Sequence, residues 1–80
     1  EIFVPKEKRI WGYYVYPILE GNTFIGRIEL QANRKENQLN VINFWKEDGV
    51  VWDEERDNEL NEELSSLALL INIENIIWLC

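Results

Sequence analysis

A tight turn between two strand-like segments constrains the fold of this chain more than any other feature. The turn is Glu20-Gly21-Asn22-Thr23, and it separates a segment rich in Tyr and Val from one in which apolar and polar side chains alternate. Gly and Asn tolerate the positive φ angles that two-residue hairpin turns require. We therefore predict an antiparallel hairpin with strands at about 12–20 and 23–32.

The second strand of this hairpin has one apolar and one polar face. Because successive side chains of a strand point to opposite faces, the alternation predicts which residues are buried. The predicted buried set is Phe24, Gly26, Ile28, Leu30 and Ala32. The predicted solvent-facing set is Thr23, Ile25, Arg27, Glu29 and Gln31. A glycine in the buried set indicates a bend or a close approach of two backbones at Gly26.

A helix is predicted over residues 53–71. Asp53 is a good N-cap, and the acids that follow it lie where the helix dipole favours negative charge. Apolar residues then recur at helical spacing and predict one buried stripe, with the rest of the helix acidic and solvated. This stripe comprises Leu60, Leu64, Leu67, Ala68 and Ile71. Residues 72–75 are expected to end the helix.

The whole pattern predicts one small α+β domain over residues 1–80. We expect an extended lead at 1–10, with Pro5 unsuited to a helix, and a three-stranded antiparallel meander at 11–47 whose third strand covers 39–46. Pro17 is expected at an edge or a bulge because it lacks an amide donor. After the helix, a last buried strand is expected at 75–79. The order β-β-β-α-β suggests a strongly curved antiparallel sheet or partial β-barrel with one amphipathic helix packed on it.

Charge is distributed unevenly along the chain. Residues 1–46 contain seven bases and five acids, a net charge of +2, whereas residues 47–80 contain ten acids and one base, a net charge of −9. A surface that binds phosphates is therefore expected only on the first half.

The residue types present exclude several kinds of active site. With no histidine and only Cys80, the chain lacks the residues for a His-based catalytic triad, an ordinary zinc site or an internal disulfide. The helix carboxylates are expected to face water, where nothing raises a pKa, and the Asp48-Gly49 segment lacks the ligand spacing of a calcium loop. We therefore predict no catalytic residue, no metal and no cofactor within these 80 residues.

The first half offers two candidate contacts for nucleic acid. A basic cluster, Lys6, Lys8 and Arg9, precedes the first strand and is a candidate for phosphate contact or a plain solvated segment. Four aromatic residues follow it: Trp11, Tyr13, Tyr14 and Tyr16. Such rings can stack on bases, but core or rim packing of a small sheet is the favoured interpretation. Arg27 suits an ion pair with Glu29 as well as a phosphate contact.

A longer string of motifs resembles a known family. In order, it comprises Ile2-Phe3-Val4-Pro5, Lys8-Arg9, Gly12-Tyr13-Tyr14-Val15, Pro17-Ile18-Leu19, Gly21, Gly26-Arg27-Ile28 and Arg34-Lys35. This string resembles the C-terminal part of the YcaQ-like winged-helix DNA glycosylases, which unhook interstrand crosslinks. The likeness covers most of the chain. It departs at Glu29, Gln31 and Asn33, where family members usually carry Asp, Lys and Asp, and the absence of the lysine weakens a phosphate contact for that strand.

The resemblance implies a cytoplasmic bacterial DNA-repair hydrolase that breaks the glycosidic bond of alkylated or crosslinked bases. This chain would be the C-terminal fragment of that protein, without membrane spans. Its catalytic motif would lie in an upstream winged-helix domain, so no catalytic residue is carried over. The expected partners are double-stranded DNA and the upstream winged-helix domains of the same chain. The candidate DNA-backbone contacts are Lys6, Lys8, Arg9, Arg27, Arg34 and Lys35. The alternative is a structural or protein-interaction domain with an acidic helix and no direct DNA contact.

Overall fold

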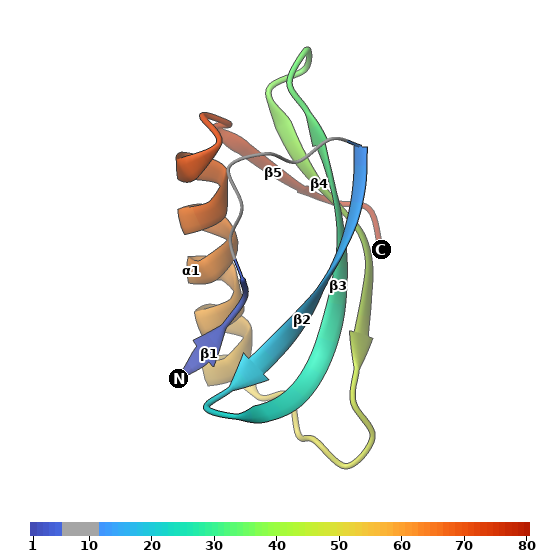
Figure 1. The fold of residues 1–80 in the computed structure, drawn as a ribbon, viewed down its shortest axis with the longest axis vertical. Coiled ribbons are helices and arrows are strands. Elements are labelled where there is room, and N and C mark those ends of the chain that lie inside the picture. Colours follow the sequence, from blue (N-terminus) through green and yellow to red (C-terminus); the bar gives the residue numbers. More distant parts are fainter. Residues whose placement is uncertain (6–11) are drawn as a thin grey trace.

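The described residues fold into a curled five-stranded sheet with one helix packed against it (Figure 1). The structure, a computed structural model, describes residues 1–5 and 12–80. Its elements are β1 (Ile2–Phe3), β2 (Gly12–Glu20), β3 (Thr23–Asn33), β4 (Gln38–Lys46), α1 (Glu54–Leu70) and β5 (Asn75–Trp78). The α+β class, the strong curvature and the single covering helix are as predicted.

Each strand pairs with the strand that precedes it in the sequence, so the sheet order is β1-β2-β3-β4-β5. The first four strands are antiparallel, whereas β5 runs parallel to β4. The sheet is therefore mixed, and not antiparallel throughout as predicted. A parallel pair needs a long crossover between its strands, and α1 supplies that crossover while it covers the concave side of the sheet (Figure 1).

The N-terminal lead contributes a strand that the sequence pattern did not predict. Ile2 and Phe3 pair with Glu20 and Leu19 at the end of β2. The amide of Val4 donates to Oε1 of Glu63 at 3.0 Å. Ile2 and Val4 are both buried, so this short segment joins the sheet to α1.

The predicted hairpin turn forms, and Gly21 adopts a left-handed φ of 60°. Next to this turn, however, the strand alternation is interrupted by a β-bulge. Ile18 pairs with Gly26 and Leu19 with Phe24, which leaves Ile25 without an opposite residue. Ile25 is consequently 2% exposed and Phe24 is 38% exposed, the reverse of the prediction. The extra residue of a bulge shifts the alternation by one position, so only the residues from Gly26 onward keep the predicted phase.

Helix α1 begins and ends as the sequence indicates. Asp53 is the N-cap, and its Oδ1 accepts a hydrogen bond from the Arg56 amide at 2.9 Å. At the other end Asn72 has a φ of 60°, and the Ile73 amide donates to the Ala68 carbonyl at 2.9 Å, the pattern of a Schellman motif. All members of the predicted stripe are buried: Leu60, Leu64, Leu67, Ala68 and Ile71. They meet the inward side chains of the sheet in one core.

The last strand is an edge strand, and not the buried strand that was predicted. Ile76 and Ile77 are partly buried, whereas Trp78 is 40% exposed and Leu79, beyond the strand, is 60% exposed. Four consecutive apolar residues resemble a core strand in sequence, but β5 has a pairing partner on one side only within the described residues.

Candidate functional site

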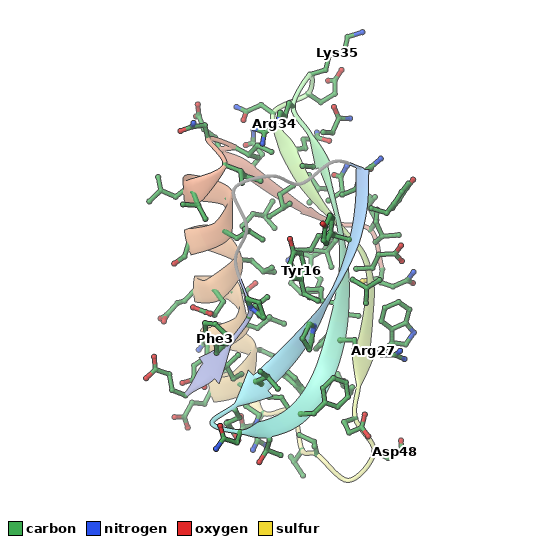
Figure 2. All side chains as sticks on the ribbon, in the orientation of Figure 1. Phe3, Tyr16, Arg27, Arg34, Lys35 and Asp48 are labelled. Carbon is green, nitrogen blue, oxygen red and sulfur yellow. The ribbon has the colours of Figure 1, made fainter. Side chains whose placement is uncertain are left out.

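Two of the predicted DNA contacts, Arg34 and Lys35, lie together in the turn between β3 and β4 (Figure 2). The turn is fixed locally, because Oδ1 of Asn33 accepts from the Glu36 amide at 3.1 Å and Asn37 takes a left-handed φ of 56°. Lys35 is exposed at the tip. This turn therefore presents at least one cation to solvent in a defined position.

Arg34 also has a structural role. Its Nη1 donates to the carbonyl of Ile71 at 2.7 Å, at the C-terminal end of α1. The last turn of α1 contains no basic residue of its own, and the carbonyls at a helix end attract positive charge. Arg34 thus caps the helix from the neighbouring turn, and only part of its guanidinium is left for another partner.

Asn37 joins the same turn to the connection between α1 and β5. Its Oδ1 accepts a hydrogen bond from the Glu74 amide at 2.9 Å, and its carbonyl accepts one from Nδ2 of Asn75 at 2.9 Å. We call the set Arg34, Asn37, Ile71, Glu74 and Asn75 the polar junction. It fixes the β3–β4 turn against the C-terminal end of α1.

Arg27 lies apart from this turn, on the side of the sheet that faces away from α1 (Figure 2). Its guanidinium lies over the ring of Trp45, 4.9 Å from the centroid, and the two residues pair across β3 and β4. Glu29 instead accepts from Nδ2 of Asn43 at 2.8 Å. Arg27 therefore makes a cation–π contact, and the ion pair with Glu29 does not form.

Of the basic cluster before the first strand, Lys6, Lys8 and Arg9 lie outside the described residues, as does Trp11. The three tyrosines differ from one another. Tyr16 is buried in the core, as the favoured interpretation required, and its ring stacks on that of Tyr14 with centroids 5.4 Å apart. Tyr14 is 37% exposed at the rim, and Tyr13 is 62% exposed.

A cluster of charged groups surrounds one ion pair. Arg56 donates from Nη2 and Nε to the two carboxylate oxygens of Glu20, at 2.8 and 3.2 Å. These hydrogen bonds lower the pKa of Glu20 below its ordinary value of 4.5. The pair borders a polar hollow of about 190 Å³, whose other lining residues are Glu1, Asp53, Glu55 and Glu59. A carboxylate that arginine holds ionised has no proton to give and is unsuited to act as a general acid. The pair of Glu20 and Arg56 therefore has the character of a structural ion pair and not of a catalytic dyad.

The sequence interpretation missed a contact that positions the N-terminal end of α1. A Cβ on Gly26 would lie 2.6 Å from the Trp45 carbonyl oxygen and 3.5 Å from Cζ2 of Trp52. Nε1 of Trp52 donates to the Ile25 carbonyl at 3.2 Å, and its ring meets that of Phe44 edge to face at 5.0 Å. We call Ile25, Gly26, Phe44 and Trp52 the aromatic junction. The close approach predicted at Gly26 is the one signal that pointed to it.

A second missed feature is an apolar groove of about 350 Å³ between the C-terminal half of α1 and β5. It is lined by Ser65, Ala68, Leu69, Ile73, Glu74 and Ile76. Leu69 is 79% exposed there. The signal in the sequence was Leu69 itself, an apolar residue that falls outside the predicted buried stripe.

Comparison with known proteins adds no identification. The chain matches no known family model, and no solved structure matches it. Within residues 1–5 and 12–80, no group of three or more Asp, Glu, Cys or His side chains lies close enough together to hold a metal ion. The described helix is too short and too polar to cross a membrane.

Proposed function

We propose that this chain is a noncatalytic domain of a YcaQ-like DNA glycosylase that assists contact with the DNA backbone and packs against the winged-helix domains. The ordered string of motifs from Ile2 to Lys35 carries the proposal. Two glycines of the string have demanding positions, since Gly21 adopts a left-handed φ and Gly26 has no room for a Cβ. A chain that preserves this string preserves the geometry of the β2–β3 hairpin.

The chemistry of the described residues supports a noncatalytic role. The carboxylate of Glu20 forms an ion pair with Arg56, and the acids in the first turn of α1 lie on an exposed surface. Cleavage of the N-glycosidic bond between a base and deoxyribose needs a side chain that is free to activate water or to stabilise positive charge on the sugar. The resemblance implies that this side chain lies in the upstream winged-helix domain.

The position of the β3–β4 turn supports contact with phosphates. Its Arg34 is bonded to the C-terminal end of α1, whereas the acids of α1 lie in its first ten residues. A helix of 17 residues is about 25 Å long, so the first acidic turn is roughly three Debye lengths from the basic turn at physiological salt. The first acidic turn therefore repels a duplex at this turn only weakly, whereas Glu63, about 12 Å before the end of the helix, and Glu36 and Glu74, beside the turn, reduce its attraction for phosphates.

A salt titration on the intact glycosylase that contains these residues tests the proposal. We expect Lys8→Ala with Arg9→Ala to lower the slope of log K against log[salt] by about 2, and Lys35→Gln to lower it by about 1. The matched control is Lys46→Gln, a cation of β4 that lies over the Phe44 ring and is not among the candidates. If the salt slopes of the candidate variants equal those of the control and of the wild type, the proposed contacts with the DNA backbone are refuted.

The second candidate function is a structural or protein-interaction domain, favoured by the exposed acids of α1. In that case Glu55→Lys with Glu62→Lys would separate the unfolding of this domain from that of the winged helices, giving two calorimetric transitions in place of one. The salt slope for DNA would not change. The two functions are therefore separated by one pair of measurements.

A further inference from the structure

The groove between α1 and β5 borders a sheet edge with unused backbone groups. The Leu79 amide donates to the Val41 carbonyl at 2.9 Å, so it points toward β4. Because amides alternate in direction along a strand, those of Ile76 and Trp78 point away from β4. In the described part of the chain no strand pairs with this second edge of β5. Ile76 belongs both to the free edge and to the groove, so the two features are continuous.

The groove is apolar at its floor and acidic at its rim. Ala68, Leu69 and Ile73 supply apolar walls, and Glu74 is exposed where β5 begins. Glu62 lies three residues before Ser65 and seven before Leu69, so it is on the same helix face. No described base lines the groove. A ligand whose apolar side chains contact the floor and whose positively charged end lies at the acidic rim would complement this surface.

A second copy of this chain fits poorly. The chain has a net charge of −7, and two copies joined edge to edge would face the same acidic rim across a twofold axis. Like charges at such a contact oppose pairing. The occupant is therefore expected to be a different, basic polypeptide.

We propose that the free edge of β5 and the α1–β5 groove bind an extended, basic segment of a partner protein, which adds to the sheet as a further strand. Its backbone hydrogen-bonds to Ile76 and Trp78, and alternate apolar side chains enter the groove beside Leu69. A flanking Lys or Arg lies near Glu74 and Glu62. This is recognition by strand addition, in which the backbone supplies affinity and alternate side chains supply specificity.

The test is an NMR titration of the 80-residue chain with a designed probe, acetyl-Lys-Val-Thr-Val-Thr-Val-Lys-amide. We expect saturable shifts at the amides of Ile76 and Trp78 and slower hydrogen exchange of these two amides when the peptide is bound. N-methylation of one alternate set of peptide amides is expected to abolish binding, whereas methylation of the other set preserves it. Only pairing along a strand edge produces this alternation.

Variants of the chain locate the site. Leu69→Glu is expected to weaken binding at least tenfold, and Glu74→Lys about threefold to tenfold. The matched control is Val51→Glu, an equally drastic change at a residue that is 72% exposed near the N-terminal end of α1, and it should leave binding unchanged.

Four outcomes would overturn the proposal. The first is the absence of shifts at the amides of Ile76 and Trp78 at millimolar peptide. The second and third are binding as tight as that of the Lys-flanked probe by a peptide flanked with Glu, or by an amphipathic helical peptide. The fourth is dimerisation of the chain through β5 in the absence of peptide, measured by sedimentation. The last outcome would assign the edge to a second copy. None of them depends on whether the chain contacts DNA.

Discussion

The two ends of α1 are attached to the sheet by contacts of opposite character. At the N-terminal end, the aromatic junction packs the Trp52 ring against Phe44 and over Gly26. At the C-terminal end, the polar junction uses a partly buried hydrogen bond from Arg34 and an exposed hydrogen bond to Asn37. Removing apolar volume costs more than removing an exposed hydrogen bond. The aromatic junction should therefore determine stability, while the polar junction positions the turn that carries Lys35.

The largest expected effect is at Trp52. Trp52→Ala removes the ring that covers Gly26 and contacts Phe44, and should lower the free energy of unfolding by about 3 kcal/mol. Urea denaturation followed by circular dichroism measures the change. Trp52→Phe keeps a ring but loses the hydrogen bond to the Ile25 carbonyl, so it should cost about 1 kcal/mol. Equal losses in both variants would show that the ring packing contributes little.

The next effect is at Gly26. Gly26→Ala places a Cβ 2.6 Å from a backbone oxygen, which has no flexible end that can move away, and should cost about 2 kcal/mol. Gly21→Ala is the comparison variant, because its Cβ would meet no atom within 4 Å but its φ of 60° disfavours alanine by about 1 kcal/mol. The urea midpoint of Gly26→Ala measures the cost of insufficient space for a Cβ, and that of Gly21→Ala measures the cost of backbone strain. A harmless Gly26→Ala would contradict the close approach of β3 and β4.

A smaller effect is expected in the polar junction. Asn37→Ala loses the acceptor for the Glu74 amide and puts alanine at a φ of 56°, so we expect a loss of about 1 to 2 kcal/mol. Asn37→Gly keeps the backbone conformation and loses only the side-chain acceptor. Thermal unfolding should therefore rank the glycine variant between wild type and Asn37→Ala. The reverse order would show that the turn conformation is unimportant.

The smallest effect is at the partly exposed ion pair between Glu20 and Arg56. The folded-state pKa of Glu20 is lowered, so the pair contributes stability above the ordinary value of 4.5, and this contribution is lost as the pH falls through the lowered pKa. Glu20→Gln should therefore be less stable than wild type at pH 7, with a difference that shrinks toward pH 3. Urea denaturation at several pH values measures it. A difference that is constant with pH would exclude the charge as its cause.

The sequence predicted those features that depend on neighbouring residues. The N-cap at Asp53, the helical stripe from Leu60 to Ile71 and the turn at Gly21 each depend on interactions within a few positions, and all three formed. Phe24 and Ile25 were assigned to the wrong faces because the bulge opposite Ile18 depends on how β3 pairs with β2. Periodicity within one strand carries no information about its partner.

The candidate site was predictable to the same extent. Arg34 and Lys35 were expected in a turn, and they lie in one. The contact between Arg27 and Trp45 depends on the β3–β4 register, which includes a second bulge, and the capping of α1 by Arg34 joins residues 37 positions apart. The free edge of β5 also depends on its parallel pairing with β4, and the run of apolar residues specified neither the pairing strand nor the direction of β5.

The position of α1 in the chain has a consequence for biosynthesis. Strands β1 to β4 leave the ribosome before the helix that covers their concave face, because the buried leucines of α1 begin at Leu60. At about 5 to 20 residues per second, the apolar face of the sheet waits on the order of seconds for its cover. The link between Val4 and Glu63, 59 residues apart, closes only after that delay. The chain is thus most prone to aggregation after the hairpins have been synthesised and before α1 covers them, and a chaperone would protect it most at that stage.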